Sequence, residues 1–130
     1  MKHEKLTVLV IEPMKKPYIK EIDAGLRSLQ QEVGGYIQVV YPWAEPCAIV
    51  CDDEAKLKGS EWNRALRDED GHIYDIVAGT FLIIGLSSNN FASLTEEYIQ
   101  QFSKVFAVPE MFVRVNEKIM VLPMRDLDDG

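Results

Sequence analysis

Two cysteines, Cys47 and Cys51, stand four positions apart and are the first residues whose type and spacing could do chemistry. In a strand, this spacing puts both side chains on one face and about 13 Å apart, which is too far for a disulfide. A zinc site would need more ligands, and His3 and His72 are distant from the pair in the sequence. We therefore expect buried, reduced thiols, and neither a metal ion nor a cofactor.

Runs of carboxylates at residues 52–54 and 68–70 offer a second kind of chemistry. Both fall where turns are expected, and acidic side chains in turns commonly bond the local backbone and stay solvated. Neither run has the glycine and glutamate spacing of a calcium loop. His72 follows a turn glycine, so an exposed turn residue is the alternative to a general base. The sequence also has no nucleophile elbow and no phosphate-binding glycine motif, so we predict no catalytic residue and favour a protein that is not an enzyme.

Trp62, Asn63 and Arg64 are the strongest candidates for a binding surface, because Trp and Arg dominate the energetics of binding interfaces. The alternative is a Trp that packs into the core beside a solvated Arg. Lys15 and Lys16 lie in a loop between two prolines and could hold a phosphate or a carboxylate. The alternative there is a solvated loop.

The charge of the chain is uneven. The formal net charge is −7, and residues 1–20 carry +3 from five lysines and two glutamates, which leaves −10 on the remainder. Nucleic-acid affinity comes from Lys and Arg that neutralise phosphates, so we predict that nucleic acid is not a partner. An acidic surface can instead mimic nucleic acid, attract a basic partner, or serve only solubility.

The apolar pattern predicts one α+β domain over residues 1–124, with a mixed or antiparallel sheet packed by two main helices. A chain of 130 residues suits one hydrophobic core but not two. Residues 125–130 form an acidic tail that we expect to be frayed. The chain opens on charged residues without a signal peptide, and no apolar stretch reaches membrane-spanning length. We therefore expect a cytoplasmic protein without a membrane partner.

Short runs rich in β-branched residues predict strands at 6–11, 18–22, 36–41 and 48–51. Residues 112–122 predict a strand, or a hairpin that turns at Asn116-Glu117.

Helical spacing over Ile22–Val33 predicts a first helix that Asp23 caps and Gly34-Gly35 ends. A capping box formed by Ser93 and Glu96 predicts the start of a second helix, which runs to Phe106.

The segment 60–86 is where the core should form. Ser60 is expected to cap a short helix through Leu66, and Asp70-Gly71 is a hairpin-type turn signal. The apolar run Ile76–Leu86 reads as one fully buried strand. Gly79, inside this run, indicates a bulge or a close backbone approach, either to a helix or to a ligand.

Five short motifs together resemble one known family. They lie at residues 11–13, 16–17, 33–37, 63–66 and 74–81, and they resemble the family catalogued as domain of unknown function 3846. The resemblance covers about residues 6–108 and leaves the segment after Pro109 unmatched. It implies a short protein of phages, conjugative elements or Firmicute genomes, and it supplies no catalytic residue because the family brings no established activity.

These observations leave three hypotheses for function. The first is a non-catalytic interaction or regulatory protein of a phage or mobile element, with a host protein as partner. The second is a small-ligand binder, for example of a nucleotide signal in host defence, with Lys15, Lys16, Trp62 and Arg64 around a pocket. The third is an acidic mimic of nucleic acid that inhibits a host DNA-binding enzyme.

Overall fold

Three largely buried strands form the centre of the molecule: β1 (Lys5–Ile11), β4 (Cys47–Asp52) and β7 (Phe81–Ser87). The computed structural model describes residues 4–88 and 90–125. Within them the main sheet has the strand order β2-β1-β7-β4-β3, with β8 paired to β7, and every pairing is antiparallel. The elements of this sheet are β1 (Lys5–Ile11), β2 (Tyr18–Asp23), β3 (Ile37–Val40), β4 (Cys47–Asp52), β7 (Phe81–Ser87) and β8 (Asn90–Ala92). The four strands predicted before residue 52 are confirmed, and the α+β class with an antiparallel sheet is as expected.

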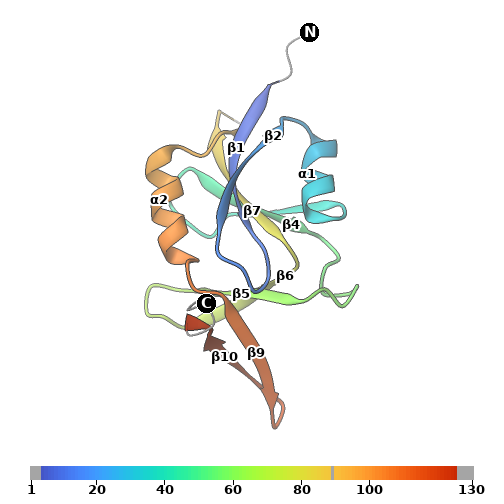
Figure 1. Ribbon diagram of the computed structural model, residues 1–130, viewed down its shortest axis with the longest axis vertical. Helices are drawn as coiled ribbons and strands as arrows, with labels where there is room; N and C mark the ends of the chain where they lie inside the picture. The colour runs from blue at the N-terminus through green and yellow to red at the C-terminus, as the bar shows by residue number, and fades with distance from the viewer. Residues whose placement is uncertain (1–3, 89, 126–130) are drawn as a thin grey trace.

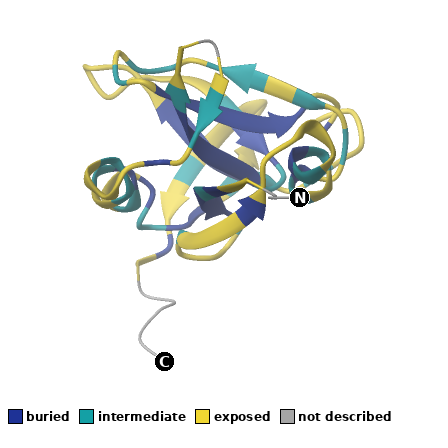
Figure 2. Ribbon diagram, turned by 90° about the horizontal axis from the view of Figure 1, so that it is seen from above, coloured by how far each residue is buried: buried dark blue, intermediate teal, exposed yellow. Residues whose placement is uncertain are grey.

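Alternate residues of the central strands enter two separate cores, because successive side chains of a strand point to opposite faces. Leu9 and Ile11 of β1 join one cluster, whereas Val8 and Val10 join the other. Figure 2 shows these buried strands in the middle of the molecule with a helix to either side. The sheet is therefore covered on both faces, which is why its central strands read as continuous apolar runs.

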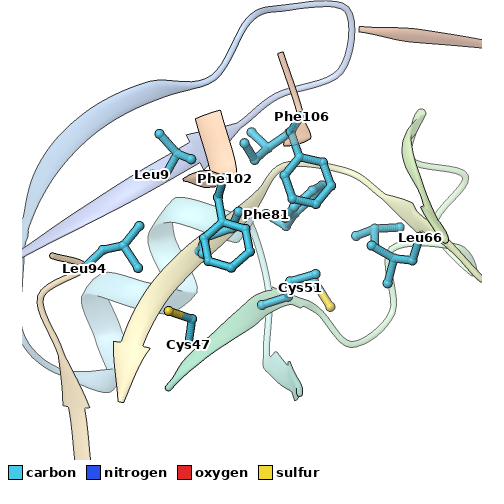
Figure 3. Packing of buried hydrophobic residues seen from close by; sticks show 12 residues of the cluster. Leu9, Cys47, Cys51, Leu66, Phe81, Leu94, Phe102 and Phe106 are labelled. Carbon is cyan, nitrogen blue, oxygen red and sulfur yellow. The ribbon is translucent and has the colours of Figure 1, made fainter. Parts of the chain in front are cut away.

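The two helices contribute to different cores. Leu29 and Val33 of α1 (Leu26–Val33) enter one cluster, and Phe102 of α2 (Glu96–Val105) enters the other. Figure 3 shows Phe102 and Phe106 meeting Phe81, Leu94 and the two cysteines from β4.

The predicted helix starts were wrong by two or more residues. The residue before α1 is Gly25, not Asp23, because Asp23 still belongs to β2. Thr95, not Ser93, caps α2 by accepting a hydrogen bond from the Tyr98 N–H. The Ser93 hydroxyl instead accepts from the Thr7 N–H at 2.9 Å and so ties this segment to β1. The predicted stop at Gly34 is confirmed, since Gly34 is left-handed with φ 86°.

A separate hairpin replaces the helix expected at residues 60–66. Strand β5 (Trp62–Arg67) pairs with β6 (Ile73–Ala78) across the turn that Asp70-Gly71 predicted. The single strand expected over Ile76–Leu86 is wrong as well, because the chain bends at Gly79 and β6 and β7 belong to different sheets. Gly79 has φ +74°, a left-handed conformation that favours glycine.

A second hairpin projects from the domain. Strands β9 (Glu110–Val115) and β10 (Lys118–Pro123) form a two-stranded ribbon that extends away from the main sheet (Figure 1). Asn116 and Glu117 both have positive φ, as the tight turn of a two-residue hairpin requires, so the turn predicted there is confirmed.

No helix among the described residues is long and apolar enough to cross a membrane. The acidic tail expected to be frayed lies outside the described residues from 126 onward.

Candidate functional site

A cleft of about 480 Å³ lies where the two hairpins meet the C-terminal end of α2. Its volume falls within the range of small-molecule sites. The polar and aromatic side chains that line it come from six parts of the chain: Trp43, Arg64, Arg67, Tyr74, Lys104, Phe106, Glu110 and Arg125. The cleft is therefore assembled by the tertiary fold and not by any local motif.

The charge of this cleft is opposite to that of the chain. Four cationic side chains line it against one carboxylate, a formal net charge of +3, although the whole chain carries −7. Lys104 and Arg125 are exposed, and neither makes an ion pair with a residue that the structure describes. An anion that entered here would meet two cations that no carboxylate of the described residues neutralises.

Arg64 is the buried centre of the cleft wall, with 1% of its surface exposed. All five of its N–H groups have acceptors. Nη2 donates to the Lys15 carbonyl at 2.7 Å and to the Phe106 carbonyl at 3.1 Å, and Nε donates to the same Phe106 carbonyl at 3.4 Å. Nη1 donates to Asn63 Oδ1 at 2.8 Å and to the Asn63 carbonyl at 3.2 Å. Arg64 thus joins the loop after β1, strand β5 and the end of α2.

No carboxylate among the described residues lies within ion-pair distance of Arg64. Burial lowers the pKa of its guanidinium to about 10, and the charge of Glu110 acts in the opposite direction. The group still carries its proton at neutral pH. With all its donors occupied, Arg64 acts on a ligand through its charge and through the position of its neighbours.

Asn63, the neighbour of Arg64 in β5, also bonds to distant parts of the chain. Its side chain is fully buried, and Nδ2 donates to the Ile11 and Gly79 carbonyls, both at 2.8 Å. These bonds link β5 to the end of β1 and to the bend at Gly79 that precedes β7. The pair of Asn63 and Arg64 therefore fixes the orientation of the β5–β6 hairpin against the main sheet.

Glu110 bridges the two hairpins. Its Oε1 accepts from the Ala65 N–H at 2.8 Å, and its Oε2 accepts from Arg67 Nη2 at 2.7 Å. Glu110 is buried while Arg67 remains about two-fifths exposed. The bridge holds the Arg67 side chain along the cleft wall, and each oxygen of the Glu110 carboxylate accepts one hydrogen bond in it.

Three aromatic residues line the cleft as well: Trp43, Tyr74 and the buried Phe106. Trp43 is half-buried and packs on Phe102, with ring centroids 4.2 Å apart, and on Phe106 at 6.3 Å. Tyr74 of β6 is 55% exposed. The cleft therefore combines cations with aromatic surface, one part of which is held rigidly by the core.

The residues predicted from the sequence do not come together as one surface. Asn63 and Arg64 lie inside, although the prediction placed them on the outside; of the five candidates, only Arg64 lines the cleft. Trp62 is half-buried and meets Phe112 of β9 edge-on at 5.9 Å. A role in binding for Trp62 stays a prediction.

The lysine loop approaches the cleft through its backbone alone. The Lys15 carbonyl accepts from Arg64, but the Lys15 ammonium lies 3.5 Å from Glu12 and its side chain is 66% exposed. Lys15 and Lys16 are not among the residues that line the cleft. The cleft is therefore lined by different residues from the pocket proposed from Lys15, Lys16, Trp62 and Arg64, and the two sets have only Arg64 in common.

The other chemistry-bearing residues lie elsewhere. Cys47 and Cys51 are buried and not disulfide-bonded, and burial raises the pKa of each thiol to about 11. Asp68, Asp70 and His72 place three ligand-type groups together on the exposed turn of the β5–β6 hairpin. Asp68 there accepts the Asp70 and His72 N–H groups, which is the backbone-bonding role expected of a turn aspartate.

The fold and the cleft define an antiparallel α+β domain with a cationic cleft beside a projecting hairpin. The chain belongs to the family described as Domain of unknown function (DUF3846), whose model matches residues 5–107. Searches of the curated proteins and of the solved structures returned no match. The β9–β10 hairpin follows the matched region, so Arg64, Arg67, Tyr74 and Lys104 come from the family domain and Glu110 and Arg125 from the segment after it.

Proposed function

We propose that the protein is a non-catalytic binding protein that holds a small anionic ligand in the cleft between the two hairpins and α2. One observation carries the proposal: the cleft has a net charge of +3 in a chain of net charge −7. A concave site lined by one sign of charge focuses the field and raises the local concentration of ligands of the opposite sign. This is the second of the three hypotheses, moved to a different set of residues.

The polar groups of the cleft support binding without chemistry. Both oxygens of Glu110 and all N–H groups of Arg64 are engaged in holding the fold. Lys104, Arg125 and the exposed part of Arg67 remain to contact the ligand. The proposal places the protein in the cytoplasm of a host cell, as an accessory of a phage or mobile element that sequesters or senses its ligand.

The test is calorimetric titration of the protein with inorganic pyrophosphate at low ionic strength, without divalent cations. Lys104→Ala should weaken binding several-fold, and Lys118→Ala should not. Lys118 is an exposed lysine at the tip of the projecting hairpin, so its removal makes the same change of net charge away from the cleft. Equal weakening by both variants would mean that only the overall charge matters, and the absence of any heat would reject the site.

A second candidate function rests on the projecting hairpin. Opposed residues in the hairpin register share one face, and one face of the ribbon carries Lys118 at the turn together with five apolar side chains: Met111, Val113, Val115, Met120 and Leu122. Four of them are 40–48% exposed. Contiguous exposed apolar surface on a projecting ribbon is typical of a protein-interaction site, which favours the first hypothesis, a host-protein partner.

Adjacent residues of β10 give a matched test of the hairpin. Met120 lies on the apolar face and Ile119 on the opposite face, and both are partly exposed. If a partner protein docks on the apolar face, Met120→Asp should abolish its capture from a host lysate while Ile119→Asp retains it. The opposite pattern would assign docking to the other face. The cleft, being cationic, gives no support to the third hypothesis of an acidic mimic.

A further inference from the structure

We infer that the ligand of the cleft is a nucleoside polyphosphate: a planar ring joined to at least two phosphate charges. The inference rests on the proposed function, because it assigns a chemical class to the anion that the cleft is proposed to hold. Two features of the cleft carry it, the amount of unbalanced positive charge and the aromatic surface beside that charge.

The charge of the cleft is too large for a simple carboxylate or a single phosphate monoanion. Glu110 neutralises Arg67 directly, which leaves the buried charge of Arg64 and the exposed charges of Lys104 and Arg125 without a described partner. A ligand with one negative charge would leave most of this charge uncompensated. A pyrophosphate group carries two or more negative charges, and its several oxygens can each meet a separate cation.

Arg67 is the residue suited to contact a phosphate directly. One of its donors, on Nη2, is occupied by Glu110, and its side chain is about two-fifths exposed. The planar guanidinium keeps further N–H groups for the ligand, and the bond to Glu110 holds it in place before the ligand arrives. Lys104 adds a point charge from the last turn of α2.

The aromatic side chains account for the planar ring. Tyr74 exposes more than half of its surface on the strand that borders the cleft, and Trp43 is anchored by Phe102 and Phe106. An exposed tyrosine beside a set of cations can stack a base, because every base has a π face. The cleft of about 480 Å³ is of a size for one small molecule.

The experiment compares ligands that differ by one part. Pyrophosphate, ADP, GDP, UDP and adenosine are titrated calorimetrically into the wild-type protein without divalent cations. We expect at least one nucleoside diphosphate to bind about tenfold or more tightly than pyrophosphate, which is the usual contribution of one stacked base, and adenosine to bind far more weakly.

A variant of the aromatic surface separates the ring from the phosphates. Tyr74→Ala should remove the gain from the nucleoside and weaken the nucleoside diphosphates far more than pyrophosphate. Tyr36→Ala is the control, since Tyr36 is 72% exposed and does not line the cleft. Lys104→Ala should weaken pyrophosphate and the nucleoside diphosphates alike.

The outcomes separate the two proposals. If pyrophosphate binds and every nucleoside diphosphate binds no better, the inference fails while the proposed function stands. If none of the ligands binds, both fail. If a single-stranded oligonucleotide binds more tightly than every nucleoside diphosphate, the ligand is a polymer and the inference is wrong.

Discussion

Replacing Arg64 with Met should destabilise the domain strongly, because three segments of the chain are joined through this one side chain. The substitution keeps the apolar stem and removes all the donors. Two acceptors that lie in the interior, the Phe106 carbonyl and Asn63 Oδ1, then lose a hydrogen bond. A buried acceptor left unsatisfied costs about 1–3 kcal/mol, so two cost about 4 kcal/mol together.

Relief of the buried charge offsets part of this cost, since burial already disfavours the charged guanidinium and lowers its pKa to about 10. The net expectation is a loss of about 3 kcal/mol of unfolding free energy, which for a chain of this length lowers Tm by about 10 °C. Arg64→Lys keeps the charge but has fewer donors and no planar fork, so its Tm should fall between those of wild type and Arg64→Met.

Thermal and urea unfolding monitored by circular dichroism measures both quantities. Arg27→Met is the matched control, because Arg27 is exposed on α1 and its substitution should stay within about 0.5 kcal/mol of wild type. If Arg64→Met melts within about 2 °C of wild type, the hydrogen bonds of Arg64 do not hold these three segments together, and the expectation is refuted.

Substitutions at three further sites test other parts of the structure. Gly79→Ala should lower the free energy of unfolding by about 1–2 kcal/mol, because φ is +74° at this position. Gly79→Val should lower it further, since a Cβ at this position already lies 3.5 Å from Ser60 Cβ. Denaturant titration measures both values, and a Val variant as stable as wild type would disprove the left-handed conformation of Gly79. Glu110→Gln should lower the free energy of unfolding by about 2 kcal/mol, because it weakens the bridge to Arg67. The same substitution should tighten pyrophosphate binding, because it removes the one negative charge that lines the cleft. Weaker binding by a normally folded variant would contradict the electrostatic explanation. For the thiols, burial and nearby carboxylates raise the pKa of Cys47 and Cys51 from 9.0 to about 11, so between these values the unfolded chain has lost protons that the folded chain still holds. Unfolding free energy should therefore fall as pH rises from 9 to 11, and a Cys47→Ala, Cys51→Ala double variant should show a shallower fall; identical slopes would show that the thiols are not responsible.

Local patterns in the sequence were sufficient for most of the strands and for both hairpin turns. The β-rich runs before residue 52 and the turn at Asn116-Glu117 form as predicted, because pairing and turn chemistry there depend on neighbouring residues. The prediction of one strand over Ile76–Leu86 failed for a physical reason: an apolar pattern reports burial and does not show that the chain bends at Gly79, between the end of β6 and the buried strand β7. The expected helix at residues 60–66 failed because pairing of β5 with β6 overrides its local helical spacing.

The site could not be found from local pattern at all. Arg64 is expected on the surface by residue type, and it is buried only because the carbonyls of Lys15 and Phe106, distant in the sequence, converge on it. Arg67, Tyr74 and Lys104 stand on three different elements, and none is unusual in its own segment. The sequence signal that pointed toward the cleft was the choice of Arg64 as a candidate, and the structure changes its role from direct contact to support.

Amide NMR during a titration with pyrophosphate locates the ligand on the molecule. The largest shifts should fall on residues 64–67 of β5 and 104–106 at the end of α2. The amides of Lys16 and of the hairpin tip near Lys118 should change little. Shifts confined to the loop that holds Lys15 and Lys16, or no shifts at millimolar pyrophosphate, would contradict the assignment of the cleft as the binding site.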